Sequence, residues 1–197
     1  VIVALSWILM SLVGCLPFVI NGEIPYFFDA FFEMVSGFTT TGATVLGNVE
    51  AVSKSANFWR TFSHFIGGMG VLVFVLAVIP SSNTGAMHIF RAESPGPTAT
   101  KFVSKLRFTA KILYLIYIGL TLILMLMLLV GGMSFYDALL HAFSTAGTGG
   151  FSTKNASIMA FNSVYIEVVI AVFMFIFGIN FNVFYLILIG KFTKAFS

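Results

Sequence analysis

The chain has 197 residues, of which 59% are hydrophobic and only 9% are charged. Soluble domains are roughly 45–50% apolar and about 25% charged, so this composition predicts a membrane protein. The 24 phenylalanines exclude a disordered chain, and ten basic residues in so apolar a sequence cannot form the charged stripe of a nucleic-acid-binding protein. The net charge of +3 therefore bears on orientation in the membrane.

The single cysteine, Cys15, lies in an apolar run and is expected to be a small, inert side chain that forms no internal disulfide. The first residue, Val1, also lies within an apolar run, with no methionine or charged stretch before it. A secretory signal has a charged leading region, so we expect a segment of a longer protein and not a signal peptide.

Four stretches without Asp, Glu, Lys or Arg are long enough to cross a bilayer, which takes about 20 helical residues. They run over 1–22, 61–90, 112–136 and 168–190. Two apolar stretches at 25–35 and 134–143 are too short to cross, so they are predicted to be re-entrant helices. Pro25 suits a first helical turn, and Ser134 with Asp137 is typical of a capping box.

Basic residues gather on one side of the predicted spans. The segment after the second span and the C-terminal end carry Arg91, Lys101, Lys105, Arg107, Lys111, Lys191 and Lys194. This side is cytoplasmic by the positive-inside rule. Six of the seven acids lie on the opposite side, beside the re-entrant segments, where an acidic mouth would attract cations. Simple tolerance of acids outside the membrane explains their placement equally well.

The chain repeats itself at a shift of 108 positions. The matches are Phe27-Phe28-Asp29-Ala30 with Phe135-Tyr136-Asp137-Ala138, Ser36 with Ser144, Thr40 with Thr148, Gly42 with Gly150, Thr44 with Ser152, and Gly70 with Gly178. Both copies enter from the cytoplasm, and parallel units around an axis normal to the membrane can enclose a pore. We expect an all-α polytopic membrane protein with two helix, re-entrant pore loop, helix repeats at 1–90 and 112–197, joined by a basic cytoplasmic linker at 91–111.

Small polar residues follow each re-entrant helix, over 39–44 and 145–152. They favour non-helical backbone, which is tolerated at membrane depth only where it is buried in protein or lines water. Its carbonyls can replace the hydration shell of an alkali cation, and the negative end of a short helix favours a cation there. An ordinary extracellular turn explains one such loop, but the matched pair favours an ion filter. The candidate filter residues are Thr39, Thr40, Thr41, Gly42, Gly147, Thr148, Gly149 and Gly150.

Small and polar residues elsewhere have simpler interpretations. Close helix packing, and not gating, is expected at Gly67, Gly68 and Gly70 and at Gly14 and Gly119. In the last span, Gly178 and Asn180 are candidates for cavity lining or gating below the filter, and a helix–helix hydrogen bond explains Asn180 equally well.

The three histidines, His64, His88 and His141, are too scattered to form a metal site and are expected to make structural hydrogen bonds. No hydrolase triad, phosphate-binding loop or dinucleotide fingerprint occurs in the sequence. The sequence therefore predicts neither an enzyme nor a tightly bound cofactor.

Four ordered motifs carry a family resemblance over nearly the whole chain. They are Glu33-Met34-Val35-Ser36-Gly37-Phe38-Thr39-Thr40-Thr41-Gly42-Ala43-Thr44, His64-Phe65-Ile66-Gly67-Gly68-Met69-Gly70, Arg91-Ala92-Glu93-Ser94-Pro95-Gly96-Pro97, and Phe143-Ser144-Thr145-Ala146-Gly147-Thr148-Gly149-Gly150-Phe151-Ser152-Thr153. With them the chain resembles the Trk/Ktr/HKT potassium transporter superfamily, and most closely its bacterial Trk-type membrane subunit. The resemblance implies a potassium-channel-like fold with four repeats around one K+ pathway, of which this chain holds the first two.

The resemblance also implies that Gly42 and Gly150 are filter glycines. Plant relatives that favour Na+ have serine at the first of these positions, so Gly42 argues for K+. The second loop departs from the stricter potassium-channel signature, because Gly147-Thr148-Gly149-Gly150 stands in place of a Val-Gly-Tyr-Gly run.

The implied setting is a bacterial inner membrane, with the pore loops facing outside. Family members dimerise and work with a cytosolic nucleotide-binding regulatory subunit, which would dock on cytoplasmic surfaces such as the basic linker. Attraction of the linker to lipid headgroups, worth about 1 kcal/mol per basic residue, is the alternative. The leading hypothesis is therefore uptake of K+ through a carbonyl-lined filter, and the competing one is a non-conducting membrane scaffold or assembly module.

Overall fold

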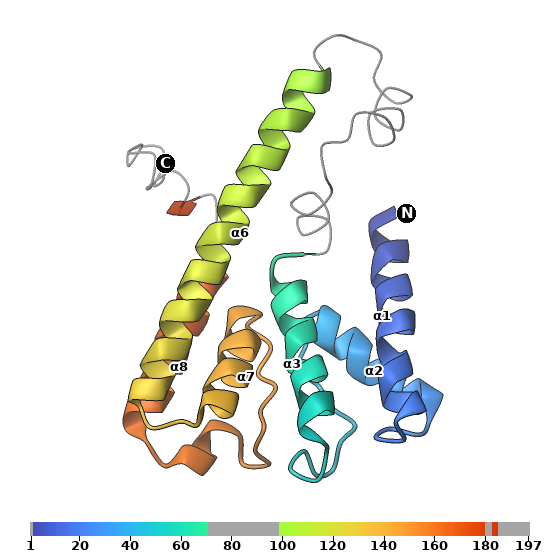
Figure 1. Ribbon diagram of the computed structural model, residues 1–197, viewed down its shortest axis with the longest axis vertical. Coiled ribbons are helices and arrows are strands. Elements are labelled where there is room, and N and C mark those ends of the chain that lie inside the picture. The colour runs from blue at the N-terminus through green and yellow to red at the C-terminus, as the bar shows by residue number, and fades with distance from the viewer. Residues whose placement is uncertain (1, 71–98, 180–182, 185–197) are drawn as a thin grey trace.

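The computed structural model describes residues 2–70, 99–179 and 183–184 (Figure 1). Within these ranges it consists of helices and loops, with no strand. The elements are α1 (Ile2–Ile20), α2 (Phe27–Phe38), α3 (Lys54–Gly68), α6 (Ala99–Val130), α7 (Phe135–Ala146), the short 3-10 helix η1 (Ser157–Phe161) and α8 (Val164–Gly178). The all-α prediction is confirmed.

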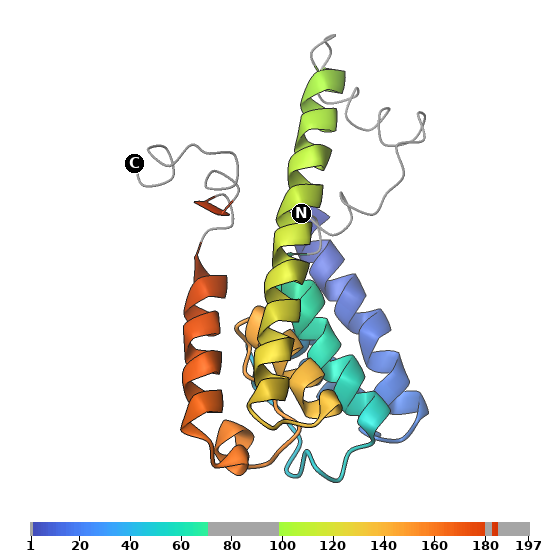
Figure 2. The ribbon, with the colours of Figure 1, turned by 60° about the vertical axis from the view of Figure 1, so that its left-hand side comes forward.

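The helices form two units with the same order of elements. In each unit a long helix, α1 or α6, leads to a short helix, α2 or α7, that starts at the lower end of Figure 1. The chain then returns to that end through a loop, so both short helices are re-entrant as predicted. Helix α3 packs against α7 and joins the units, and Figure 1 shows α6 and α8 on the other side of α7. In Figure 2, α8 and α1 lie at opposite edges of the molecule.

Each unit has its own apolar core. The first is built by Cys15 and Phe18 of α1, Met34 and Phe38 of α2, and Ile66 of α3, all of them buried. Cys15 is fully buried, as expected for a small inert side chain.

The second core lies where α6 and α8 close over α7. Leu124 and Leu128 of α6 meet Phe173 of α8 across the small side chains Ala138 and Ala142 of α7. Alanine at these positions lets α6 and α8 approach α7 closely.

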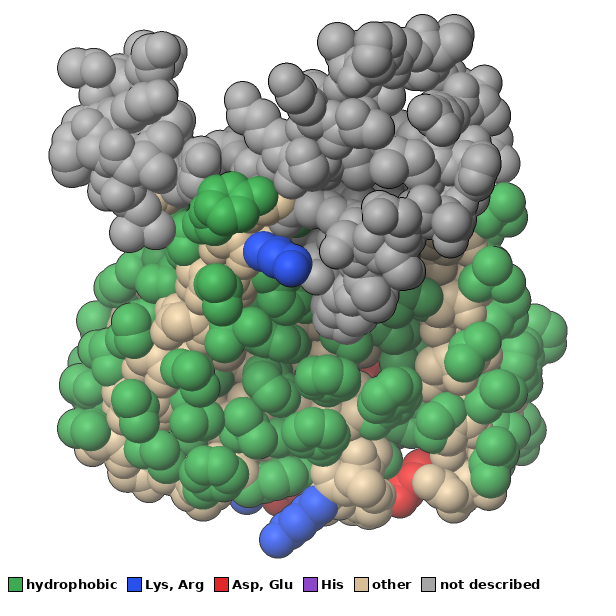
Figure 3. Space-filling model, turned by 45° about the horizontal axis from the view of Figure 1, so that its top comes forward, with side chains coloured by type: hydrophobic (Ala, Val, Ile, Leu, Met, Phe, Trp, Pro, Cys, Tyr) green, Lys and Arg blue, Asp and Glu red, His purple; other side chains and the backbone are tan. Residues whose placement is uncertain are grey.

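Large apolar side chains cover the outside of the long helices (Figure 3). Val13 of α1 is 65% exposed, Val130 of α6 is 82% exposed and Phe175 of α8 is 75% exposed. Among the described residues, the part of α6 over Ala110–Val130 is long and apolar enough to cross a membrane, and Ala4–Ile20 and Val164–Gly178 are shorter apolar helices. These surfaces suit contact with lipid.

The stretches without Asp, Glu, Lys or Arg were wrong predictors of where several helices begin. Helix α3 starts at Lys54 and not near Thr61, because Ser53 caps it and Arg60, a charged residue, is accommodated inside the protein. Helix α8 starts at Val164 with Glu167 in its first turn, where the helix dipole favours an acid. The stretch 112–136 becomes a helix that already begins at Ala99 and ends at Val130.

Of the two predictions for the starts of the re-entrant helices, one is confirmed and the other is wrong. In α7, Ser134 Oγ accepts a hydrogen bond from the Asp137 amide at 3.1 Å and donates to Asp137 Oδ2 at 2.7 Å, so the predicted cap is confirmed. In α2 the cap residue is Tyr26, which makes no side-chain capping bond. Pro25 therefore lies before the helix, and the prediction that it occupies the first turn was wrong.

Candidate functional site

Helices α2 and α7 end in the same backbone motif. In both, the amide of the first residue beyond the cap donates to the second-last helical carbonyl, and the next amide donates to the third-last. The bonds are Thr40 to Gly37 at 3.1 Å, Thr41 to Ser36 at 2.9 Å, Thr148 to Thr145 at 2.9 Å and Gly149 to Ser144 at 3.0 Å. This Schellman arrangement ends each helix and turns the chain into a loop. We call residues 39–45 the first pore loop and residues 147–153 the second pore loop.

The turning residue of each cap is a threonine in the left-handed region. Thr40 has a φ of 55° and Thr148 a φ of 54°. Glycine is the usual residue there, and a β-branched side chain is strained in this conformation. The same uncommon conformation at positions 108 apart shows that the two pore loops follow the same backbone path.

Both loops then place a glycine at a positive φ, 77° for Gly42 and 92° for Gly150. A Cβ on Gly42 would overlap the carbonyl oxygen of Gly149, so the two loops are in direct contact here. A Cβ on Gly150 would meet no described atom within 4 Å. Gly42 is thus required both by its conformation and by a close approach, whereas Gly150 is required by its conformation.

The eight candidate filter residues lie in these two adjoining loops. Thr39 is the cap of α2, where its hydroxyl donates to the Val35 carbonyl at 2.6 Å and lies 2.8 Å from the Thr41 hydroxyl. Gly147 is the equivalent cap of α7. The other candidates do not join them: Gly178 is the last residue of α8, and Asn180 and His88 lie outside the described residues.

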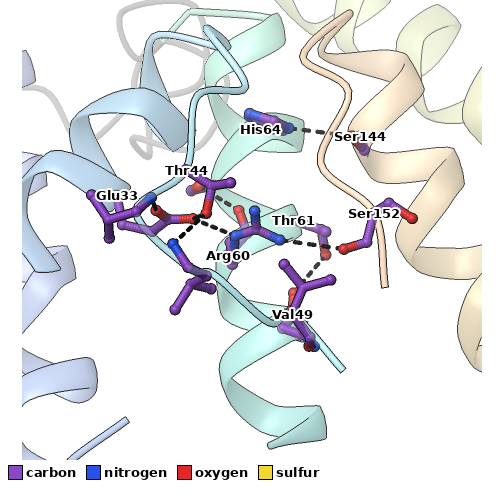
Figure 4. A network of polar contacts seen from close by, with 12 residues as sticks. Glu33, Thr44, Val49, Arg60, Thr61, His64, Ser144 and Ser152 are labelled. Atoms are coloured by element: carbon purple, nitrogen blue, oxygen red, sulfur yellow. Dashed lines mark hydrogen bonds and ion pairs between the residues drawn. The ribbon is translucent and has the colours of Figure 1, made fainter. Parts of the chain in front are cut away.

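A polar side chain on each re-entrant helix hydrogen-bonds the pore loop of the same repeat. In the first repeat, Glu33 accepts hydrogen bonds from the Thr44 hydroxyl and the Val45 amide, both at 2.9 Å (Figure 4). In the second, His141 Nε2 lies 3.0 Å from the Ser152 hydroxyl. Glu33 and His141 are 108 positions apart and therefore equivalent. A carboxylate in the first repeat and an imidazole in the second thus each hydrogen-bond the pore loop of their own repeat.

Arg60 of α3 links the two loops. It is 2% exposed and forms an ion pair through Nε with the fully buried Glu33. Its Nη1 donates to the Ser152 carbonyl at 3.3 Å, and its guanidinium lies 3.7 Å from the centre of the Phe151 ring. One side chain therefore binds the re-entrant helix of the first repeat and the pore loop of the second (Figure 4).

Asp137 accepts a hydrogen bond from the last residue of the second pore loop. Its Oδ1 accepts from the Thr153 hydroxyl at 2.6 Å. Partial burial opposes ionisation of this carboxyl, but the hydrogen bonds from Thr153 and Ser134 outweigh it and hold the pKa of Asp137 below its usual value. The carboxylate is thus ionised wherever the loop is folded at neutral pH.

The segments that flank the pore loops of the two repeats are also joined by direct hydrogen bonds. The Val49 amide donates to Asn155 Oδ1, and Asn155 Nδ2 donates to Asn48 Oδ1, each at 2.8 Å. The Tyr136 hydroxyl donates to the Lys54 carbonyl at 2.8 Å. Together with Arg60, these bonds set the position of one repeat relative to the other.

Glycines on α3 allow its close approach to both re-entrant helices, as predicted. A Cβ on Gly67 would overlap the Phe38 carbonyl oxygen, and a Cβ on Gly68 would lie 2.8 Å from Gly147 Cα. Gly14 likewise packs under the Met34 side chain. Gly70 and Gly119 show no such contact, since a Cβ on either would meet no described atom within 4 Å.

The two described histidines make structural hydrogen bonds, as expected. His141 Nδ1 lies 2.8 Å from the Asp137 carbonyl, and His64 Nδ1 lies 3.4 Å from the Ser144 hydroxyl. Within residues 2–70 and 99–179, no three His, Cys, Asp or Glu side chains are grouped as metal ligands.

Comparison with known proteins identifies the family. Residues 1–196 match the family model described as TrkH, cation transport protein. The chain belongs to the TrkH family. It is 41% identical over 198 residues to the Trk system potassium uptake protein TrkH of Salmonella typhimurium. The matched region covers 99% of this chain and 41% of that protein. The chain is 36% identical over 196 residues to the Trk system potassium uptake protein TrkG of Escherichia coli, with 98% and 40% covered.

A solved TrkH structure confirms the fold. The crystal structure of the potassium transporter TrkH from Vibrio parahaemolyticus superposes with a TM-score of 0.76 at 34% identity, over 98% of this chain and 38% of that one. The chain is therefore an all-α polytopic membrane protein of helix and pore-loop repeats, as the sequence predicted. It spans about two fifths of the length of these relatives.

Sequence reasoning on this TrkH-family chain missed the link between the repeats. The sequence places Glu33 and Arg60 only on the side of the re-entrant segments and does not pair them, but both are buried. A signal was available: Glu33 lies past the middle of a predicted re-entrant helix, and Arg60 directly precedes a predicted span. Ionisable residues at membrane depth need a partner, which should have suggested pairing one with the other.

Proposed function

We propose that this chain supplies half of a K+ uptake pathway, in which K+ passes the backbone carbonyls of residues 39–42 and 147–150. The observation that carries the proposal is the pair of pore loops, which share one backbone path and touch at Gly42 and Gly149. The names of the relatives, potassium uptake proteins and a potassium transporter, support K+ as the transported ion.

The electrostatics of the two short helices support a cation at this point. Helices α2 and α7 both end at the pore loops, and each helix C-terminus carries the equivalent of about −0.5 charge. Carbonyl oxygens can replace the water lost by K+ when it enters a narrow passage. Glycine at position 42, in place of the serine of Na+-favouring relatives, is in keeping with K+.

The complete pathway requires more chain. We propose that the repeats at 1–90 and 112–197 are the first two of four in one polypeptide, joined by a basic linker at 91–111. Below the filter, Gly178 and Asn180 would line or gate a water-filled cavity. The share of the relatives' length that this chain covers, 41%, suits two repeats of four.

The proposed setting is the inner membrane of a bacterium, with the pore loops facing outside. The four-repeat protein would act as a homodimer in the lipid bilayer, with a cytosolic nucleotide-binding regulatory subunit of the Trk kind docked on cytoplasmic surfaces that include the basic linker. The chain would need no tightly bound cofactor, since K+ is the transported ion.

Uptake of Rb+, a K+ analogue, into vesicles that contain the four-repeat protein tests the transport function. We expect Rb+ to accumulate and to be displaced by K+ more effectively than by Na+, because the proposed carbonyl filter would replace the hydration shell of K+ and of the similar ion Rb+. Vesicles without protein are the control. Absence of uptake in correctly folded protein would favour the competing function, a membrane scaffold that keeps only the repeat fold.

The 197-residue segment alone is expected to give no K+-selective conductance in planar bilayers. A filter needs oxygens on all sides of the ion, and potassium channels use four loops. Two loops leave carbonyls facing hydrocarbon at a cost of several kcal/mol each. Co-expression of the missing half should restore transport. Selective single-channel currents from the segment, in a form shown to be monomeric by cross-linking, would contradict the four-repeat pore.

A further inference from the structure

His64 lies where α3 of the first repeat crosses the second pore loop. It is completely buried, and its ring stacks on Phe151 with centroids 4.0 Å apart and planes inclined by 20°. Figure 4 shows the side chain reaching from α3 toward Ser144, at the end of α7. A residue of one repeat thus forms part of the packing surface for the loop of the next.

The backbone of the second pore loop lies directly on His64. A Cβ on Gly149 would come within 2.5 Å of both ring nitrogens, so the edge of the imidazole between them faces the Gly149 backbone. A Cβ on Gly147 would lie 2.5 Å from the His64 carbonyl oxygen. Glycine at these two positions leaves no side chain between the loop and the histidine.

Gly149 also touches the first pore loop, through the carbonyl oxygen that lies against Gly42. The Gly149 peptide is therefore in contact with the His64 ring and with the opposite loop at the same time. Any change in the size or shape of the side chain at position 64 must move this peptide, or Phe151 beside it, because buried packing leaves little free space.

The imidazole is not shared by the two repeats of this chain. The shift of 108 places Val172 of α8 at the position equivalent to His64, and valine carries no ring. The imidazole is thus no general requirement of the repeat fold.

We propose that His64 is a positioning residue of the ion pathway, whose flat, buried ring holds the Gly149 carbonyl at the distance from the first pore loop that K+ requires. This inference rests on the proposed K+ transport. It assigns to His64 an effect on ion discrimination that acts through Gly149, without contact between His64 and the ion.

The test is a double-mutant cycle in the four-repeat protein, with the ratio of Rb+ to Na+ uptake into vesicles as the readout. We expect His64→Ala and Gly149→Ala each to lower the ratio by roughly tenfold, since displacements of about 1 Å have effects of that order or more. His64→Ala removes the ring that contacts the Gly149 backbone, and Gly149→Ala adds a methyl group that collides with this ring. Combined, they should lower the ratio less than the product of the single effects, because the methyl group then occupies space that the ring has left.

A second variant and a control separate positioning from folding. His64→Leu keeps a buried side chain of similar volume but no flat face, and should lower the ratio as His64→Ala does at a normal amount of protein. Thr61→Ala removes another buried side chain of α3, whose hydroxyl donates to carbonyls of its own helix, and should leave the ratio unchanged.

The outcomes distinguish this inference from the proposed function. Suppose that the wild-type protein discriminates between the ions. An unchanged ratio in His64→Leu would then overturn the positioning role alone, and so would effects of His64→Ala and Gly149→Ala that simply multiply. A folded wild-type protein that takes up no Rb+ would overturn both the transport function and the role of His64.

Discussion

Replacing Arg60 by methionine is expected to destabilise the protein by about 3–5 kcal/mol, because Glu33 would keep a buried charge without its partner. Both side chains are almost completely removed from solvent, and Arg60 also donates to the Ser152 carbonyl of the second pore loop. The substitution therefore removes the ion pair and the link between the repeats together. Unfolding in detergent, followed by circular dichroism, measures the loss.

Two further variants show whether the unpaired charge is the cause. Arg60→Met combined with Glu33→Gln should be more stable than Arg60→Met alone, since the neutral amide can still accept from Thr44 or Val45. Lys54→Met removes an exposed basic side chain from the first turn of the same helix, where its ammonium lies 5.7 Å from the centre of the Tyr136 ring, and should change stability by about 1 kcal/mol or less. Equal losses in Arg60→Met and Lys54→Met would mean that the buried pair contributes nothing specific.

Substitution of Gly42 by serine is expected to lower discrimination between K+ and Na+ more than it lowers stability. The new Cβ would overlap the Gly149 carbonyl, and the φ of 77° strains any residue but glycine. The loop must shift, while the helices lose no contact. We expect the K+/Na+ uptake ratio of the four-repeat protein to fall by about tenfold or more, which corresponds to about 1.4 kcal/mol of differential ion binding.

Gly47 offers a matched control for this experiment. It lies just beyond the first pore loop, and a Cβ there would meet no described atom within 4 Å, so Gly47→Ser should leave the ratio unchanged. Gly150→Ser should act in the same direction as Gly42→Ser through its φ of 92°. If both substitutions left the ratio at the wild-type value, Gly42 and Gly150 would not be filter residues and the shift of 108 would reflect common ancestry of the repeats alone.

The order of helices, the re-entrant segments and the pairing of the loops could be predicted from the sequence because they depend on local properties. A run of apolar residues has a length, Ser134 caps the helix that follows it, and two copies of one motif fold alike. The equivalent conformations of Thr40 and Thr148 follow from this similarity.

The burial of Glu33 and Arg60 and the packing of Gly149 on His64 were decided by the tertiary structure alone. Arg60 lies 27 positions from Glu33 and 92 from Ser152 along the chain, and no local pattern specifies which of these groups will meet. Charge placement assigned both ionisable residues to one side of the membrane but not to solvent or core, and the packing of α3 between α2 and α7 buries them. The free energy of a buried charge depends on the partners that the fold supplies, and those partners come from the neighbouring repeat as well as from their own.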